Sequence, residues 1–186
     1  MKEALLVIDV QNEYFSGSLP ITYPTGTLKN ILLAMDAAHA AKIPVLIIQH
    51  INKDTNAPTF RQGTDASELH PEIKKRPYDL LIQKAFPGSF TDTCLGDWLS
   101  HNSVCLLTIS GYMTQMCCDT TARQGYHRGY AVKFLSDATG TLTVANKAGM
   151  VQDSDLHRAV LVTQQSKFSH VMTTSEWIHS LSINYK

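Results

Sequence analysis

The chain has 186 residues, enough for one domain to bury well over half of the surface of its unfolded state without disulfides or a structural metal. Sixteen basic and sixteen acidic residues leave no formal net charge, which disfavours nucleic acid and membranes as partners. No apolar run approaches the roughly 20 residues of a membrane span. We therefore expect a single domain over residues 1–186.

Apolar runs of strand length alternate with segments of helical periodicity along the chain. The runs lack polar alternation, which is typical of parallel strands buried on both faces. In chain order, the expected strands cover residues 4–9, 44–49, 80–83, 104–110, 131–136 and 170–173. The expected helices cover residues 25–41, 91–99, 114–128 and 154–165, followed by a last helix capped by Thr174 or Ser175. This alternation predicts an α/β protein, a three-layer α/β/α domain with a doubly wound, mainly parallel sheet.

Two helix starts and one long loop complete the expected organisation. Thr25 or Thr27 is available as N-cap of the first helix, and Ser89 and Asp92 have capping-box spacing for the second. Residues 52–77 form the longest stretch without periodicity, with room for one turn of helix. Loops of this length often border a site.

Three reactive side chains follow three different strands of the predicted sheet. Asp9 and Lys84 each close an apolar strand, and Cys117 lies in the first turn or so of the helix after the fourth strand. Because ligands of such sheets bind outside the carboxyl ends of the strands, we expect these groups to share one crevice. A buried ion pair of Asp9 with Lys84 and no chemistry is the simpler alternative. Near a helix N-terminus and a cation, Cys117 is expected to favour its thiolate.

The four cysteines suggest reduced thiols rather than a disulfide framework. An adjacent pair is strained as a bridge, and the short N-terminal apolar run, which carries Asp9, does not resemble a secretory leader. We therefore expect a cytoplasmic protein. Cys94, Cys105 and Cys118 are expected to be small buried hydrophobic residues.

Four segments of the sequence resemble the isochorismatase-like cysteine hydrolases, a family that includes nicotinamidases and N-carbamoylsarcosine amidase. In chain order they read LLVIDVQNEYF, QKAFPGSFTDTCLGDWL, SGYMTQMCCDTTARQGYHRGY and VKFLSDAT, and together they span most of the chain. The third segment is similar to the family pattern Gly-x-x-Thr-x-x-Cys-x-x-x-Thr-Ala. The resemblance implies the isochorismatase-like, Rossmann-type fold expected above.

The resemblance also implies a catalytic triad. Asp9 would be the base, Lys84 its electrostatic partner and Cys117 the nucleophile. It further implies a cis peptide between Tyr112 and Met113, with an oxyanion hole formed by the backbone amides of Met113 and Cys117. Such a site would cleave a C–N bond of an amide, lactam or ureido compound through a thioester.

One departure from the family concerns metal. Nicotinamidases bind a divalent ion through an Asp-x-His pair and further histidines, whereas His50 and Asn52 stand roughly at the positions of that pair here. His50 alone does not supply three ligands, so we expect no metal and no other cofactor. His50 is instead expected to line the crevice as a hydrogen-bonded side chain.

The sequence pattern says least about which residues contact the substrate and which partners the chain has. Residues beside the three motifs could bind a flat or cyclic small molecule: Asn12, Phe15, His50, Phe60, Phe86, Phe90 and Tyr112. The family resemblance implies a homodimer or larger homo-oligomer. Two alternatives remain open, an isochorismatase-type vinyl ether hydrolase and a non-catalytic or redox-responsive protein in which Cys117 and Cys118 react with oxidants.

Overall fold

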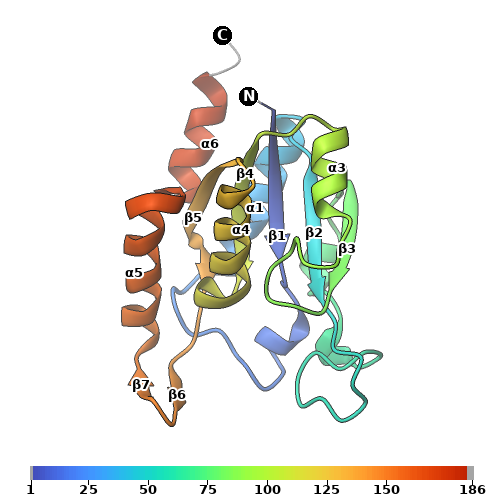
Figure 1. The fold of residues 1–186 in the computed structure, drawn as a ribbon, viewed down its shortest axis with the longest axis vertical. Helices are drawn as coiled ribbons and strands as arrows, with labels where there is room; N and C mark the ends of the chain where they lie inside the picture. The colour runs from blue at the N-terminus through green and yellow to red at the C-terminus, as the bar shows by residue number, and fades with distance from the viewer. Residues whose placement is uncertain (1, 184–186) are drawn as a thin grey trace.

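The computed structural model describes residues 2–183 and contains a six-stranded sheet between layers of helices (Figure 1). The strand order is β3-β2-β1-β4-β5-β8, and every neighbouring pair is parallel. The strands of this sheet are β1 (Glu3–Ile8), β2 (Val45–His50), β3 (Leu80–Lys84), β4 (Leu106–Tyr112), β5 (Ala131–Gly140) and β8 (His170–Met172). This order confirms the doubly wound α/β prediction.

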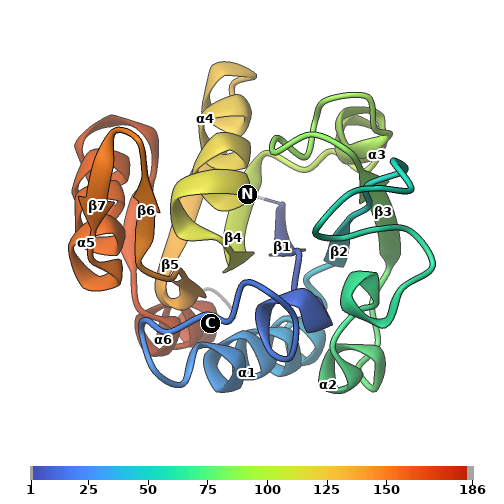
Figure 2. The ribbon, with the colours of Figure 1, turned by 90° about the horizontal axis from the view of Figure 1, so that it is seen from below.

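Helices cover both faces of the sheet, as Figure 2 shows from the edge where the strands end. Helices α1 (Thr27–Ala40) and α6 (Thr174–Ile183) lie on one face, while α3 (Leu95–His101) and α4 (Asp119–His127) lie on the other. The remaining helices are α2 (Pro71–Lys74), α5 (Asp153–Thr163), the 3₁₀ turns η1 (Asn12–Tyr14) and η2 (Asp65–Ser67), and the π-helical turns η3 (Thr114–Cys118) and η4 (Gln164–Phe168). No helix within residues 2–183 is both long and apolar enough to cross a bilayer.

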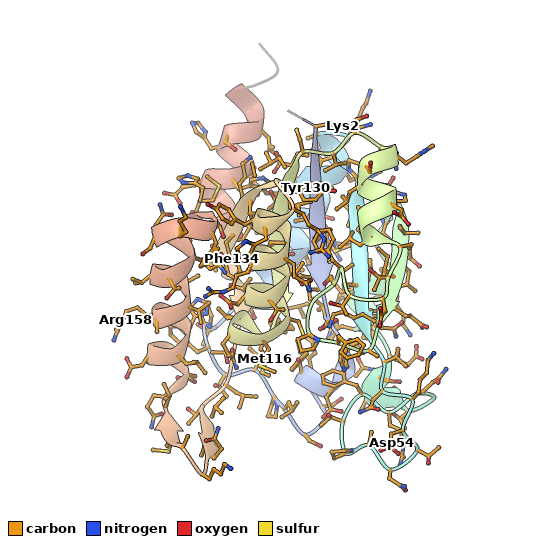
Figure 3. The ribbon with its side chains drawn as sticks, viewed as in Figure 1. Lys2, Asp54, Met116, Tyr130, Phe134 and Arg158 are labelled. Atoms are coloured by element: carbon orange, nitrogen blue, oxygen red, sulfur yellow. The ribbon has the colours of Figure 1, made fainter. Side chains whose placement is uncertain are left out.

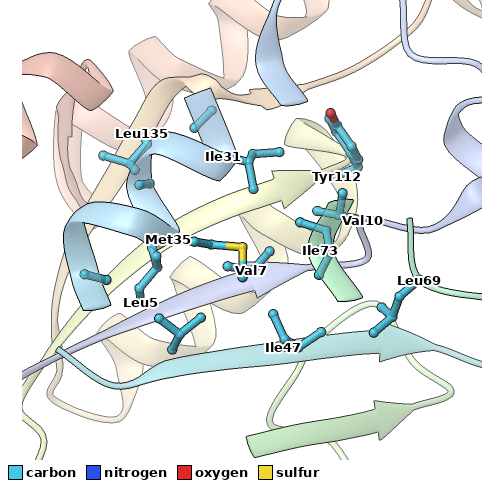
Figure 4. Packing of buried hydrophobic residues seen from close by; sticks show 14 of the residues in the cluster. Leu5, Val7, Val10, Ile31, Met35, Ile47, Leu69, Ile73, Tyr112 and Leu135 are labelled. Carbon is cyan, nitrogen blue, oxygen red and sulfur yellow. The ribbon is translucent and has the colours of Figure 1, made fainter. Parts of the chain in front are cut away.

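The apolar runs form strands because a strand in a covered sheet buries alternate side chains on its two faces. In β1, Leu5 and Val7 pack beneath α1, where Figure 4 shows them beside Ile31 and Met35. The alternate side chains of β1 belong to the opposite cluster, under α3 and α4. Each such side chain contributes roughly 1.5–3 kcal/mol on burial, which outweighs local helix propensity in these short runs.

Several helix boundaries differ from the sequence-based expectation. The N-cap of α1 is Gly26, at φ +82, with no side-chain cap from a threonine. The capping box predicted at Ser89 and Asp92 is wrong, because α3 begins only at Leu95 and the Ser89 hydroxyl bonds Thr121 instead. The capping box of α6 lies one residue before Thr174, with Thr173 and Glu176 bonding each other reciprocally.

Two irregular features near the end of β5 were not expected. Pairing with β4 passes from Ile109↔Phe134 to Gly111↔Thr139, so β5 carries a bulge. After β5, the chain forms the antiparallel hairpin β6 (Val144–Asn146) and β7 (Gly149–Val151) before α5. The bulge releases backbone groups of β5 from the sheet, so they are free to bond helices.

Candidate active site

The sheet brings the three predicted catalytic side chains to one edge. Asp9 directly follows β1, Lys84 is the last residue of β3, and Cys117 lies in η3, which follows β4. Strands β1, β2 and β3 are parallel neighbours, so their carboxyl ends meet at this edge. Asp9 holds φ +53, a left-handed backbone conformation that is uncommon outside glycine. Such outliers cluster at functional sites.

The Lys84 ammonium is the centre of the site. Its Nζ lies 2.7 Å from Asp9 Oδ2, 3.2 Å from Cys117 Sγ and 3.2 Å from His50 Nδ1. These contacts use all three N–H donors of a lysine. The side chains of Lys84 and Asp9 are both completely buried. Burial alone would lower the pKa of Lys84, but Asp9 and Cys117 outweigh it and raise that pKa, so the ammonium keeps its charge.

His50, the third contact of Lys84, is a neutral imidazole. Burial lowers its pKa, the neighbouring Lys84 charge lowers it further, and Asp9 opposes both. Since the ammonium can only donate, Nδ1 of His50 accepts its hydrogen bond, and the ring proton belongs on Nε2. His50 therefore presents an N–H donor on its other side.

The surroundings of Cys117 favour its thiol form over the thiolate that a helix start and a cation alone would favour. Burial raises the pKa of the thiol, the Asp9 carboxylate raises it further, and the Lys84 charge opposes them without prevailing. A carboxylate oxygen stands beside this thiol, because Oδ1 of Asp9 is buried and has no hydrogen-bond partner among the described residues. Asp9 is therefore the candidate base of the site.

The same groups bear on metal binding. Ligand atoms of Asp9, His50 and Cys117 lie within 4.8 Å of one another, close enough to surround an ion. Lys84 Nζ already contacts all three side chains, so the ammonium supplies the positive charge that a metal would bring. A metal would have to displace a fully buried lysine, and the donor set therefore does not fit one. Absence of a metal remains our prediction.

The backbone before the cysteine has the form implied by the family resemblance. The peptide between Tyr112 and Met113 is cis, and η3 begins immediately after it. The carbonyl of Met113 accepts hydrogen bonds from the amides of Met116 and Cys118. Gly111 is needed just before the cis peptide, because a Cβ there would lie 2.0 Å from the Ile8 carbonyl oxygen.

Aromatic rings form a cluster beside the triad. Phe60 stacks edge-on against His50 and Tyr14, and Tyr14 in turn contacts Tyr112. Phe15 adds to the cluster through Tyr112 and His70. Of the expected substrate contacts, Phe15, His50, Phe60 and Tyr112 are therefore brought together.

Three other expected substrate contacts are placed differently. Phe90 is buried in the cluster under α3 and α4 that also contains Cys117, 5.8 Å from the Tyr130 ring. Figure 3 shows Tyr130 at the end of α4 remote from Met116, the neighbour of Cys117, so Phe90 packs toward the far end of that helix and its contact with a substrate stays a prediction. Phe86 is half exposed, and Asn12 bonds the backbone and carboxylate of Asp65.

The remaining cysteines differ from expectation in two of three cases. Cys94 and Cys105 are exposed, while Cys118 is buried as predicted. Cys105 was placed within a strand, but β4 begins only at Leu106, so its side chain precedes the buried run. Two surface thiols therefore accompany the buried Cys117.

Two site residues were given no role by sequence reasoning. Gln11 is completely buried, and its side-chain amide donates to the carbonyls of His50 and Ser67 and accepts from the His50 N–H. It thus fixes the end of β2 relative to β1. Tyr14 is buried, which raises its pKa, and the nearby Asp9 carboxylate raises that pKa further. The sequence signal that could have found them is their position, because Gln11 and Tyr14 follow closely after Asp9, the acid at the end of the first strand.

Comparison with known proteins identifies relatives over almost the whole chain. A sequence profile described as the isochorismatase domain matches residues 3–176. The chain is 30% identical over 179 residues to YddQ, an uncharacterized isochorismatase family protein of Bacillus subtilis, covering 96% of this chain and 99% of that one. It is also 30% identical over 190 residues to nicotinamidase 3 of Arabidopsis thaliana, covering 96% of this chain and 88% of the relative.

Solved structures agree with these sequence relatives. The crystal structure of an isochorismatase-like protein from Burkholderia xenovorans superposes with a TM-score of 0.95 at 43% identity, covering 97% of this chain and 88% of that one. Profile, relatives and fold therefore lead to one conclusion. The chain belongs to the isochorismatase family and is a hydrolase.

Proposed function

We propose that this chain is a cysteine hydrolase that cleaves a C–N bond of a small amide, lactam or ureido compound through a thioester on Cys117. One observation carries the proposal: a single buried ammonium, Lys84, contacts both the Asp9 carboxylate and the Cys117 sulfur. A buried ion pair without chemistry would need only the first contact. The second contact, together with the free Oδ1 of Asp9, supplies a nucleophile and its base.

Each step of the reaction is assigned to groups of the site. Asp9 Oδ1 takes the thiol proton as the Cys117 sulfur attacks the carbonyl carbon, and backbone amides of Met113 and Cys117 stabilise the oxyanion. The C–N bond then breaks, and the nitrogen leaves with the proton held by Asp9. Water attacks the thioester while Asp9 accepts one of its protons, and the released sulfur recovers a proton as the acid departs.

The surroundings of the triad favour a neutral, flat substrate. Rings of Tyr14, Phe15, Phe60 and Tyr112 stand beside the cluster, and Phe15, the one of the four that is only partly buried, offers an apolar face. Among residues 2–183, Lys84 is the one cation that acts on the Cys117 thiol, and its three donors are already used. An acidic substrate group would find no second buried cation at the triad within that part of the chain. Nicotinamide itself is not favoured, because His50 and Asn52 stand where nicotinamidases have their metal-binding Asp-x-His pair.

The proposal is tested by screening small neutral amides, ureas and lactams for release of ammonia or amine. Wild type is expected to hydrolyse at least one of them, while Cys117→Ala and Asp9→Asn lose that activity by several orders of magnitude. Cys105→Ser is the matched control, because its thiol is exposed and remote from the triad, so its rate should equal wild type.

Trapping distinguishes the proposed chemistry from its alternatives. Acid quench and mass spectrometry of a slow substrate should find the acyl group on the peptide that contains Cys117. Full activity in Cys117→Ala would remove the thioester route and favour vinyl ether hydrolysis, which does not need an acyl sulfur. Failure of every compound, with oxidants modifying Cys117 selectively, would favour the redox-responsive alternative.

A further inference from the structure

A buried histidine outside the triad connects to the helix that carries the nucleophile. His157, on α5, is 4% exposed, and its Nδ1 lies 2.9 Å from the hydroxyl of Thr114. Thr114 is completely buried and is the first residue of η3. It therefore stands between Met113 and Cys117, whose backbone amides are the proposed oxyanion donors. The proposed reaction assigns His157 no role.

The other side of the imidazole is held by the bulge in β5. Its Nε2 lies 2.9 Å from the carbonyl oxygen of Ser136. Ser136 falls between the two registers that β5 makes with β4, and it is also outside the pairing with β8. The bulge thus turns a backbone acceptor toward α5, where a regular strand would direct it to a neighbour in the sheet.

The chemistry of these partners fixes the direction of both hydrogen bonds. A carbonyl oxygen only accepts, so Nε2 of His157 must carry the proton. Burial lowers the pKa of His157 and the Ser136 carbonyl opposes this, so the ring is neutral at pH 7. Nδ1 of the neutral ring is then an acceptor, and the Thr114 hydroxyl donates to it. The result is a directed chain from η3 through α5 to β5.

We propose that His157 is a positioning residue that holds the oxyanion-hole backbone through Thr114. The inference rests on the proposed function, because it concerns the donors that would stabilise the acyl-transfer intermediate. Thr114 follows the cis peptide and precedes Cys117 by one helical turn, so fixing its side chain fixes the turn that carries both amides. A small displacement of preorganised donors is costly in acyl transfer, because their value depends on distance to the oxyanion.

The test compares two reactions of the same sulfur. Acetylation of Cys117 by p-nitrophenyl acetate breaks the ester C–O bond and passes through an oxyanion, releasing p-nitrophenolate. Alkylation by iodoacetamide displaces iodide and forms no oxyanion. Both rates are measured in a Cys94→Ser/Cys105→Ser background, which removes the exposed thiols. Both probes act without knowledge of the natural substrate.

Three variants and one control give the expected pattern. His157→Leu should slow acetylation by about tenfold to a hundredfold while alkylation stays within about twofold of the parent. His157→Gln retains one acceptor and one donor and should recover most of the acetylation rate. Thr114→Val removes only the hydroxyl and should reproduce the loss. His179→Leu, which changes an exposed histidine on α6, should alter neither rate.

The split between the two rates decides the proposal. Equal falls in both rates would assign His157 to general stability of the site and overturn the positioning role. Unchanged acetylation in folded His157→Leu or Thr114→Val, checked by circular dichroism, would overturn it as well. If His157→Leu does not fold, Thr114→Val carries the test alone. If the variants show the split but the wild type hydrolyses no amide, urea or lactam, the proposed function is contradicted and the positioning role stands.

Discussion

Replacing Lys84 with methionine tests the central electrostatic claim about this site. The substitution keeps an unbranched apolar stem but removes the ammonium that bonds Asp9, His50 and Cys117. Asp9 would be left as a buried carboxylate, and its Oδ1 already has no partner among residues 2–183. We expect Lys84→Met to lower the free energy of unfolding by about 3–5 kcal/mol, the cost of breaking a buried pair from one side.

The magnitude follows from burial and not from distance. A surface pair, Lys74 with Glu68, has an N···O separation of 2.6 Å, close to the 2.7 Å of Lys84 with Asp9. Its side chains are about half exposed, so Lys74→Met should cost less than about 1 kcal/mol. The double variant Asp9→Asn/Lys84→Met removes both charges. Its loss in free energy of unfolding should be smaller, by about 2 kcal/mol or more, than the summed losses of Asp9→Asn and Lys84→Met.

Urea unfolding at pH 7, followed by circular dichroism, measures these differences. The folded pKa of Lys84 is raised above its unfolded value, so its contribution is fully present at pH 7 and is lost only as pH rises through the folded pKa. If the free energy of unfolding falls by about 2 kcal/mol per molar urea, the expected loss for Lys84→Met lowers the urea midpoint of unfolding by roughly 2 M. Equal, small shifts of the urea midpoint for Lys84→Met and Lys74→Met would refute the reasoning, because burial of the ion pair would then have no effect on its contribution to stability.

Two further predictions concern the backbone and pH. Gly111→Ala should lower the free energy of unfolding by more than about 4 kcal/mol or prevent folding, because its Cβ would lie 2.0 Å from the Ile8 carbonyl oxygen. Gly149→Ala is the control: Gly149 also has a positive φ, but its Cβ would meet no atom within 4 Å, so the loss in the same urea assay should be only about 1–3 kcal/mol. Burial lowers the pKa of His50 and of His157 in the folded chain, so the unfolded chain takes up protons first and stability should fall as pH drops below about 6.5. His157→Gln should make the decline between pH 7 and pH 5 shallower, and an unchanged slope would contradict that assignment.

Some expectations remain predictions after the structure is known. Catalysis by Asp9, Lys84 and Cys117, self-association, a cytoplasmic location and independence of cofactors each call for their own measurement. Sedimentation of the purified chain measures self-association directly. Metal analysis of the purified protein, together with activity after chelation, addresses the cofactor question.

The sequence by itself determined the layers and the edge at which the site lies. Runs such as residues 4–8 are apolar at every position, and only a sheet covered on both faces buries them all. A charged side chain at the end of such a run has to lie at the rim, which is why Asp9 and Lys84 could be placed together before any coordinates. Helix starts were less accurate, because the N-caps of α1 and α3 are Gly26 and Cys94, and neither forms the side-chain hydrogen bond that sequence reasoning sought.

Only the tertiary structure decided how these groups act on one another. The pKa of Cys117 depends on burial by segments distant in sequence, and burial and the Asp9 carboxylate raise it against the opposing charge of Lys84. The partners of His157 depend on a bulge that shifts the register of β5, and no residue type marks a bulge in advance. Local pattern fixes which face a side chain takes, but pKa values and hydrogen-bond partners arise from contacts across the whole chain.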